Sequence, residues 1–277
     1  MGTGTLLARR REPVLWADSI APRSVAASPF ARVAQHVCDP VGMDDRLMNA
    51  VLDNATWCHL VCSTLGIEGR FEADAWVSPR RTPPGYPDAV TLIPDASGGD
   101  VLSRIDGSDG CSVKDSFADL DLESQGFRIL FDARWICREA GPAPAPGVRW
   151  TRVTQPVELR AWALQHGGGP TFSDRLLAPA SVVILAAHDA GELIGGAIAS
   201  VADAAVGILN VFVTDSRIAD AGDAAFMAAF AGATGAIAER FPDRPIVGYL
   251  AGAELAAARA AGYEEIGPLR VWLKDGS

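Results

Sequence analysis

Residues 182–216 read VVILAAHDAGELIGGAIASVADAAVGILNVFVTDS, and this stretch decides the fold. It contains three apolar runs separated by short turns, and the first turn, residues 189–191, has the Asp and Gly typical of tight reversals. The runs are residues 182–188, 193–202 and 206–213. The pattern predicts three consecutive antiparallel strands. The third run is apolar on both faces except at Asn210, which is typical of a buried central strand.

The segment after the third predicted strand has a different character. Residues 214–223 are polar and contain glycine, which predicts a loop, and residues 222–240 are alanine-rich and predict a helix. The first N–H groups of a helix lack partners within the helix and attract anions. This junction is therefore a candidate site for an anionic cofactor.

The composition limits the functional classes. The chain has 277 residues, 49% of them hydrophobic, which is enough for two modest domains or one large one. A net charge of −10 disfavours nucleic acids and anionic membranes as partners. Apolar runs stay short of the ~18 residues of a membrane helix. Five cysteines, an odd number, do not suggest a disulfide framework, so we expect a cytoplasmic protein.

The N-terminal part divides into an extension and a folded segment. Residues 1–42 show no sustained periodicity and predict an extension. Residues 44–65 carry an apolar stripe at helical spacing. Cys58 and Cys62 share one face of this helix, but His59 points off it and no second ligand pair follows at zinc spacing. We therefore expect no metal, and buried thiols in its place.

The remaining elements before residue 139 predict an N-terminal α/β domain, residues 43–139. We expect strands at 70–78, 88–94 and 127–138, and helices at 97–104 and 113–120. The loop at 79–87 contains Arg80 and Arg81. Two interpretations stay open for it: a cover over an acceptor site that attracts an anionic substrate, or a solvent-facing connector.

Residues 140–147, AGPAPAPG, are proline-rich and predict a linker, which makes residues 148–277 a C-terminal domain. Around the three-strand meander we expect strands at 148–153, 246–250 and 263–273, and helices at 155–166, 171–178, 222–240 and 254–261. His166, at the end of one predicted helix, is expected to cap it.

This element order resembles the GCN5-related N-acetyltransferase (GNAT) superfamily. The final strand–helix–strand is also similar, because an alanine-rich helix runs into Gly262 and Tyr263. The resemblance implies an α/β (α+β) fold with a mixed, mostly antiparallel sheet flanked by helices. The N-terminal half is compatible with a worn second copy of this fold, although no residue-level repeat supports it.

The resemblance also implies an acyl-CoA-dependent N-acyltransferase that moves an acetyl group from acetyl-CoA to a small-molecule or peptide amine. Members of the family bind acetyl-CoA where the third strand of the meander parts from the next strand, here residues 206–213 and 246–250. The implied cofactor-binding residues are Val211, Phe212, Val213, Arg217, Ala221 and Gly222.

The phosphate-binding loop departs from the family pattern Arg/Gln-x-x-Gly-x-Gly/Ala. An alignment that starts at Arg217 puts Asp220 at the first glycine, whereas keeping the helix register puts Ala221 and Asp223 at the two glycines. Either alignment places a carboxylate in the phosphate cradle, at a cost of ~1 to 4 kcal/mol. Arg217 is a phosphate partner or an exposed loop arginine.

The family's proton-donating tyrosine corresponds to Ala258 here. Tyr263 matches an aromatic core position, so Tyr249, on the strand beside the opening, is the candidate catalytic phenol. Asn210 is the second catalytic candidate: it holds a water or the substrate amine, or is satisfied by neighbouring backbone.

Two functions therefore remain open: the N-acetyltransferase, or a non-catalytic GNAT-like binding protein that has lost its cofactor chemistry. Pairing of sheet edges into a homodimer is ordinary for this architecture, and we carry a homodimer as a further expectation.

Overall fold

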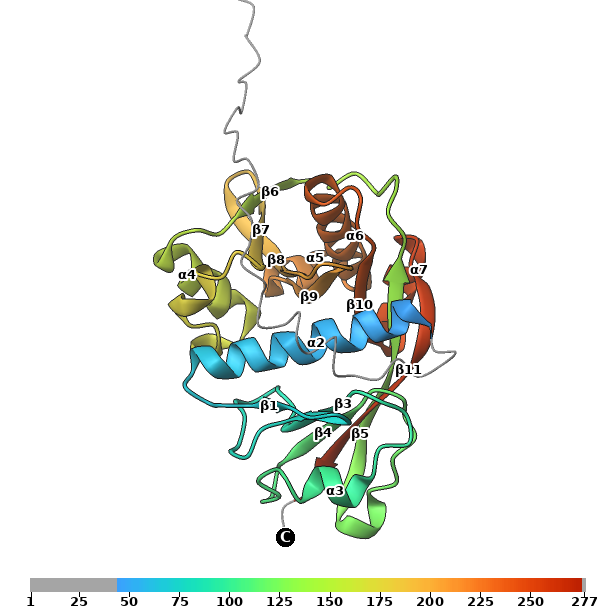
Figure 1. The fold of residues 1–277 in the computed structure, drawn as a ribbon. Coiled ribbons are helices and arrows are strands. Elements are labelled where there is room, and N and C mark those ends of the chain that lie inside the picture. Colours follow the sequence, from blue (N-terminus) through green and yellow to red (C-terminus); the bar gives the residue numbers. More distant parts are fainter. Residues whose placement is uncertain (1–43, 276–277) are drawn as a thin grey trace, which may run out of the picture. The chain divides into compact units, whose positions relative to one another are not determined.

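A single mixed sheet organises residues 44–275, which are the residues that the computed structural model describes (Figure 1). All of them belong to one unit, residues 37–277. The sheet has eleven strands in the order β1-β2-β3-β4-β11-β5-β10-β9-β8-β7-β6. The extension predicted for residues 1–42 lies outside the described residues.

The meander that the sequence predicted is confirmed. Its strands β7, β8 and β9 pair antiparallel, and β6 pairs antiparallel with β7 at the sheet edge. These four strands are Arg149–Arg152, Val182–Asp189, Glu192–Val201 and Val206–Val213.

Strand β5 joins the two halves of the chain. It spans Phe127–Arg138, as predicted, and pairs antiparallel with β10 (Ile246–Ala251) on one side and β11 (Glu264–Lys274) on the other. Strands β3–β4 and β9–β10 pair parallel, whereas the other strand pairs are antiparallel. The predicted fold class, a mixed and mostly antiparallel sheet flanked by helices, is therefore confirmed.

The small strands of the N-terminal half correct two predictions. The strands are β1 Arg70–Phe71, β2 Ala75–Val77, β3 Ala89–Thr91 and β4 Ser112–Asp115. The single strand predicted at 70–78 is a β1–β2 hairpin, and Asp74 in its turn binds Arg104 at 2.6 Å. The helix predicted at 113–120 is wrong: this segment begins as β4 between β3 and β11, and Asp115 then accepts the Leu120 N–H at 2.9 Å.

The helices cover both faces of the sheet. They are α2 Asp45–Thr64, α3 Gly98–Leu102, α4 Pro156–His166, α5 Asp215–Ala221, α6 Asp223–Arg240 and α7 Leu255–Ala260. Short 3-10 turns occur at Glu123–Gln125, Gly169–Thr171, Asp174–Leu177 and Gly252–Glu254. Two of these turns stand where a helix was predicted at 171–178. Within residues 44–275, no helix combines the length and apolarity needed to cross a bilayer.

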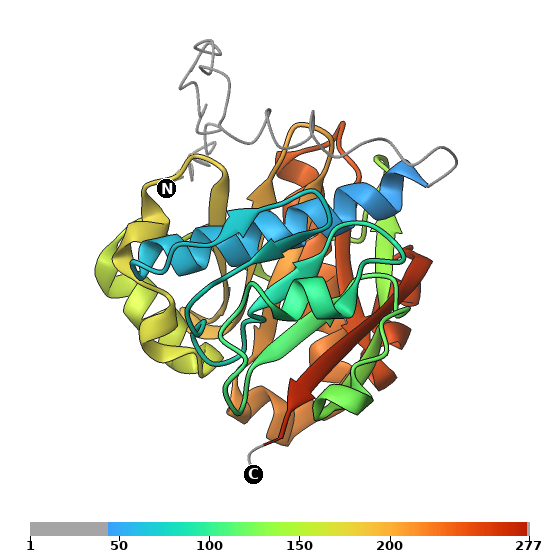
Figure 2. The same ribbon diagram turned by 60° about the horizontal axis from the view of Figure 1, so that its bottom comes forward.

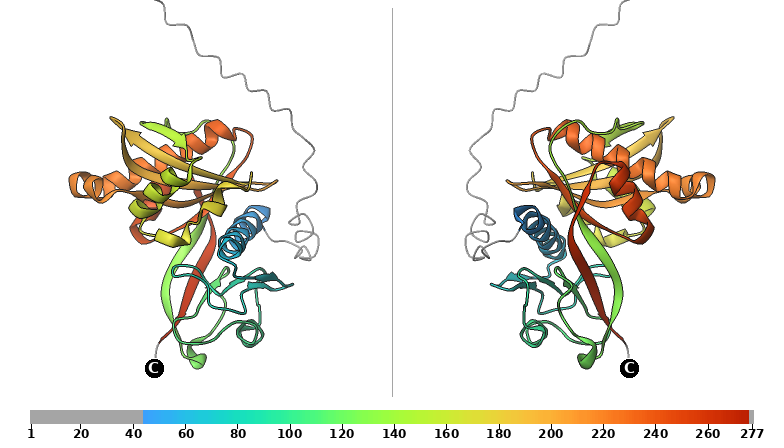
Figure 3. Two further views of the ribbon diagram at one scale, coloured as in Figure 1. Left: turned by 90° about the vertical axis from the view of Figure 1, so that its left-hand side faces the viewer. Right: turned by 90° about the vertical axis from the view of Figure 1, so that its right-hand side faces the viewer.

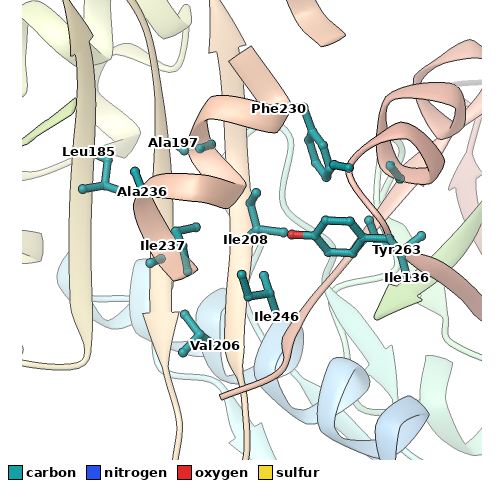
Figure 4. Packing of buried hydrophobic residues seen from close by; sticks show 14 of the residues in the cluster. Ile136, Leu185, Ala197, Val206, Ile208, Phe230, Ala236, Ile237, Ile246 and Tyr263 are labelled. Atoms are coloured by element: carbon teal, nitrogen blue, oxygen red, sulfur yellow. The ribbon is translucent and has the colours of Figure 1, made fainter. Parts of the chain in front are cut away.

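Successive side chains of β9 point to opposite faces of the sheet, and they show that α6 covers one face and that α2 and α4 cover the other. Ile208 packs in one cluster with Phe230 and Ile237 of α6, whereas Leu209 packs in another with residues of α2 and α4. Figure 3 shows α6 and α2 on opposite sides of these strands, and in Figure 2 α2 runs across the sheet. The cluster under α6 includes Tyr263, whose ring lies among aliphatic side chains in Figure 4. The interpretation of Tyr263 as a packing residue is therefore confirmed.

The apolar residues that alternate along β5, at 127, 129, 131, 133 and 135, are only partly buried. Ala133 and Trp135 pack in one cluster with residues of α2, whereas Ile129 and Phe131 are 37% and 36% exposed. Alternation thus predicted the strand correctly. Burial of these residues is confined to the two ends of the strand, because Phe127, at 5% exposed, packs in a separate cluster with Trp272.

The predicted linker, residues 140–147, packs on α6. An added Cβ at Gly235 would lie 2.3 Å from the Pro144 carbonyl oxygen, and one at Gly232 would lie 2.7 Å from that of Pro146. Glycine at these two positions lets the linker approach the helix backbone. The segment between β5 and β6 is therefore held on the helix that covers the C-terminal half.

A buried carboxyl fastens α2 to the sheet. Asp53 is 6% exposed, and Ser200 Oγ of β8 donates to its Oδ1 at 2.6 Å. Gly207 of β9 leaves room for this carboxyl, because an added Cβ there would lie 1.9 Å from Asp53 Oδ2. Burial raises the pKa of Asp53 to about 7.

We expect Asp53→Asn to remove a pH-dependent part of the stability. The folded-state pKa of about 7 lies above the ordinary 3.8, so this group's stability contribution is fully present below about pH 4 and is lost as the pH rises through about 7. In that interval the loss is about 1.4 kcal/mol per pH unit. Urea denaturation at several pH values should show the wild type losing free energy of unfolding relative to the variant.

The matched control is Asp203→Asn, at an exposed aspartate in the turn between β8 and β9. It makes the same chemical change at the protein surface and leaves the buried carboxyl in place, so it should retain the pH-dependent loss of the wild type. The same pH-dependent loss in Asp53→Asn would contradict the assignment of Asp53 as the titrating group.

Candidate active site

Strands β9 and β10 part shortly after they meet. Their parallel pairing comprises Ile246 with Val206 and Val247 with Gly207, and the strand pairing ends there. On its other edge β9 contains a bulge, because the register with β8 shifts between the pairs that Gly196 and Ile198 make. Asn210 lies in this bulge with a φ of 51°, in the left-handed region. The parting of these strands, on which the sequence interpretation depended, is confirmed.

A cavity of about 300 Å³ lies where the strands part. Its walls come from both faces of the sheet. From the α6 face it is lined by Ile208, Val211, Phe226, Phe230, Leu250 and Glu254. From the α2 face the polar or ionisable lining side chains are Asn54, Cys58, Tyr86, Lys114, His166 and Tyr249. The cavity is therefore an opening through the sheet, mostly apolar at one end and polar at the other.

His166 closes the polar end from α4. Its ring stacks on Trp162 at a centroid distance of 5.2 Å and meets the edges or faces of Phe172 and Phe212. Its Nδ1 is buried and makes no hydrogen bond within the described residues. Burial lowers the pKa of His166, so the imidazole is neutral at neutral pH. The expectation that His166 caps its helix is wrong, since Gly167, with a φ of 82°, ends α4.

Tyr86 enters the cavity from the loop between β2 and β3. Its hydroxyl is buried and has no hydrogen-bond partner in the described part of the chain. Burial raises the pKa of Tyr86, whereas the side chain of Asn210 lowers it. The side chain of Asn210 also raises the pKa of His166, which burial lowers. The structure thus gathers Asn210, His166 and Tyr86 from three separate segments at one point of the cavity.

A second polar group lies on the β10 side. The ring of Tyr249 meets Trp135 edge to face, with centroids 5.6 Å apart. The Lys114 ammonium lies 4.3 Å from the Tyr249 ring centroid and donates to Asn54 Oδ1 at 2.7 Å. Both predicted catalytic residues, Asn210 and Tyr249, therefore line the cavity, together with a lysine that the sequence interpretation did not single out.

The loop arginines point elsewhere. Arg80 donates to the Gly66 carbonyl, and Arg81 pairs with Asp88 at 2.5 Å. Neither lines the cavity, although Pro84 and Tyr86 of the same loop do. The loop therefore lines the cavity with its apolar part and with one phenol, while its two arginines bind Gly66 and Asp88.

The segment expected to bind pyrophosphate is not a loop. Residues 215–221 form α5, which corrects the prediction, and Gly222, with a φ of 54°, separates α5 from α6. Arg217 lies in α5 and pairs with Asp189, and Asp223 occupies the first turn of α6. Of the other predicted cofactor residues, Val211, Phe212 and Val213 follow the bulge in β9, and Ala221 ends α5.

The cysteine pair of α2 faces the protein interior. Cys58 and Cys62 are buried, and burial raises the pKa of both thiols. His59 Nδ1 accepts a hydrogen bond from Trp76 Nε1 at 3.3 Å. Among the described residues, no three or more histidine, cysteine, aspartate or glutamate side chains gather as metal ligands would.

The solved structures with the same architecture include a GNAT protein. A GCN5-related N-acetyltransferase from Kribbella flavida superposes with a TM-score of 0.56 at 16% identity, over 79% of this chain and 96% of its own. A functionally unknown conserved protein from Staphylococcus epidermidis has a TM-score of 0.50 at 13% identity, over 78% and 98% of the two chains. The chain therefore has the GNAT fold.

These similarities concern the structure and not the sequence. No protein-family model and no curated protein matches it. The similarity thus lies in the arrangement of strands and helices, and the chemistry has to be argued from the cavity itself.

The left-handed backbone at Asn210 predicts how substitutions there change stability. A β-branched residue is strained at a φ of 51°, whereas glycine is not. We expect Asn210→Val to lower the free energy of unfolding by about 1–3 kcal/mol and Asn210→Gly to change it by less than about 1 kcal/mol. Urea denaturation of the two variants measures this, and equal stabilities would contradict the left-handed bulge.

Proposed function

We propose that the protein is an acyl-CoA-dependent N-acyltransferase that moves an acetyl group from acetyl-CoA to a small-molecule or peptide amine. The observation that supports this most directly is the opening between β9 and β10, which is lined from both faces of the sheet. Such an opening lets a thioester enter from one face and an amine from the other. Transfer between two bound molecules needs that convergence.

The apolar end fits the thin arm of the cofactor. Beyond Gly207 the edge of β9 that faces β10 is not used in the pairing of these two strands, so backbone groups near Val211, Phe212 and Val213 can pair with an amide-bearing chain. Side chains of Val211, Phe226 and Leu250 line this end. Arg217, Ala221 and Gly222 follow β9 in the chain, in and just after α5, and are the proposed neighbours of the phosphates.

When bound, acetyl-CoA supplies a thioester carbonyl as the electrophile. Nδ1 of His166 is positioned to accept the proton of the attacking amine, because it is buried, neutral and without a partner in residues 44–275. Asn210 holds the amine or a water beside it. Tyr249, on the β10 side of the cavity, is the proposed proton donor to the departing sulfur. It would take the role of the family's tyrosine, whose position is occupied here by Ala258.

One observation favours a second candidate, a binding protein with the same fold. Helix α5 occupies the place of a glycine-rich loop, Arg217 is engaged by Asp189, and Asp223 brings a carboxylate to the start of α6. Each of these features weakens an anion site. A protein that bound an amine in the polar end without turning over acetyl-CoA would fit them.

Calorimetry with acetyl-CoA separates the two candidates. The acyltransferase requires saturable binding at or below millimolar concentration, followed by acetylation in a panel of amines. Absence of binding at that concentration would remove the acyltransferase and leave the binding protein.

For the enzyme, we expect His166→Gln to lower kcat by about 10²- to 10⁴-fold, because the glutamine cannot accept the proton. The Kd for acetyl-CoA should not change. The pKa of His166 lies below its ordinary value, so wild-type kcat should rise with pH through a pKa below 6.5 and stay level above it. Steady-state kinetics from pH 5 to 8 measure both effects.

His188→Gln is the matched control. His188 belongs to β7, faces Thr151 Oγ1 at 3.4 Å and lies outside the cavity. Its loss should leave kcat and the pH profile unchanged. An unchanged profile in His166→Gln would instead remove His166 as the base.

A further inference from the structure

A lysine is buried at the polar end of the cavity. Lys114 is 5% exposed, and its strand β4 is held on both sides, by β3 at Val90 and by β11 at Val271. Taking an ammonium out of water is costly unless it is paired. A side chain fixed at this position therefore needs a compensating interaction.

The fixed partners of Lys114 are neutral. Its Nζ donates to Asn54 Oδ1 at 2.7 Å and lies 4.3 Å from the centre of the Tyr249 ring. Within residues 44–275 it forms no ion pair. An ammonium has three donors, so the two that Asn54 does not take remain for a group in the cavity.

The groups that line this end of the cavity do not provide a counter-charge, and the nearby Asp53, whose pKa burial raises to about 7, does not line the cavity. Cys58 is a thiol whose pKa is raised by burial, and the pKa of the Tyr86 phenol is raised likewise, so both are neutral at neutral pH. His166 is neutral as well. The carboxylate among the cavity-lining side chains, Glu254, is exposed and belongs to the α6 face. The polar end thus carries one positive charge in a protein of net charge −10.

We propose that Lys114, with Asn54, forms a subsite for the carboxylate of the acceptor, and that the acceptor is a small amine carrying that carboxylate, as a free amino acid does. A carboxylate would accept from the two remaining ammonium donors and replace the water that Lys114 lost. The amine of the same molecule would lie toward His166. A single ammonium without an arginine beside it suits a singly charged carboxylate better than a phosphate.

This inference rests on the proposed function for the role of the amine, but the carboxylate site can be tested without acyl transfer. The chain has only two lysines, Lys114 and Lys274. Lysine labelled with 13C at Cε therefore gives two ε-methylene environments in NMR spectra, and each can be assigned by substitution. Lys274 donates to the Gly107 carbonyl at 2.7 Å, away from the cavity, and is an internal control.

The probes are L-amino acids and the amines that lack their carboxylate, such as valine with isobutylamine and phenylalanine with phenethylamine. We expect at least one amino acid to shift the Lys114 signal saturably and to bind about tenfold or more tightly than its matched amine, as a charged hydrogen bond would provide. The Lys274 signal should stay in place. If no amino acid moves the Lys114 signal, or matched amines bind equally well, the inference is overturned.

Substitution gives the second measurement. Lys114→Met keeps the length of the side chain and removes the charge, so it should abolish the preference for the amino acid over its amine. Lys274→Met should retain that preference. Thermal denaturation shows whether each variant is folded, and the labelled wild type decides the question if Lys114→Met is not.

The results separate this inference from the proposed function. Carboxylate-dependent binding without acetyl transfer would overturn the acyltransferase and leave the subsite standing. Acetyl transfer to amines with no preference for a carboxylate would overturn the subsite and leave the acyltransferase standing.

Discussion

The parting of two parallel strands is the constraint on which the rest of this structure depends. Strands β9 and β10 hold each other through Val206 and Gly207, and then the bulge at Asn210 turns β9 away. A continuous sheet would separate the α6 face from the α2 face completely. Because the strands separate, side chains on the two faces line one cavity. Every chemical role considered for this protein requires that connection.

The closed end of the opening is held by unusually close packing. Gly207 allows the buried Asp53 carboxyl of α2 to reach Ser200 of β8, and Gly248 of β10 approaches the Ile208 carbonyl oxygen, where an added Cβ would lie 2.9 Å away. Both contacts lie at or beside the last paired residues. The packing of α2 therefore holds β9 and β10 together at the point where the two strands separate.

Local sequence patterns predicted the elements that depend on local rules. The meander, α2 and β5 were predicted because apolar periodicity and capping residues specify them within a few residues of chain. Strand β4 was missed for the opposite reason. Residues 113–120 have apolar side chains at helical spacing, but the segment becomes a strand by pairing with β3 and with β11, which is about 150 residues away in the chain. The secondary structure of this segment is set by the strands it pairs with, and local periodicity carries no information about them.

The same limit explains the site residues. Asn210 and Tyr249 were found because a polar residue in an apolar strand and a phenol on the next strand are visible in the sequence. His166 looked like a helix end. Its stacking on Trp162, four residues earlier on α4, is a local helical contact, but its contacts with Phe172 and Phe212 come only from the three-dimensional packing. The sequence held a weak indication of a special role for Lys114. It is one of only two lysines in the chain, and it directly follows Val113.

The walls of the cavity come from both halves of the chain. The apolar end is built by β9, β10 and α6, whereas much of the polar end comes from α2, the loop before β3 and strand β4. Strands β5 and β11 join these parts, because the two strands pair along most of their length. A change in β4 or in the loop can therefore alter which acceptor is bound without changing the place where the strands part. The N-terminal half therefore forms a wall of the site, and under the proposed function it is the part that would select the acceptor.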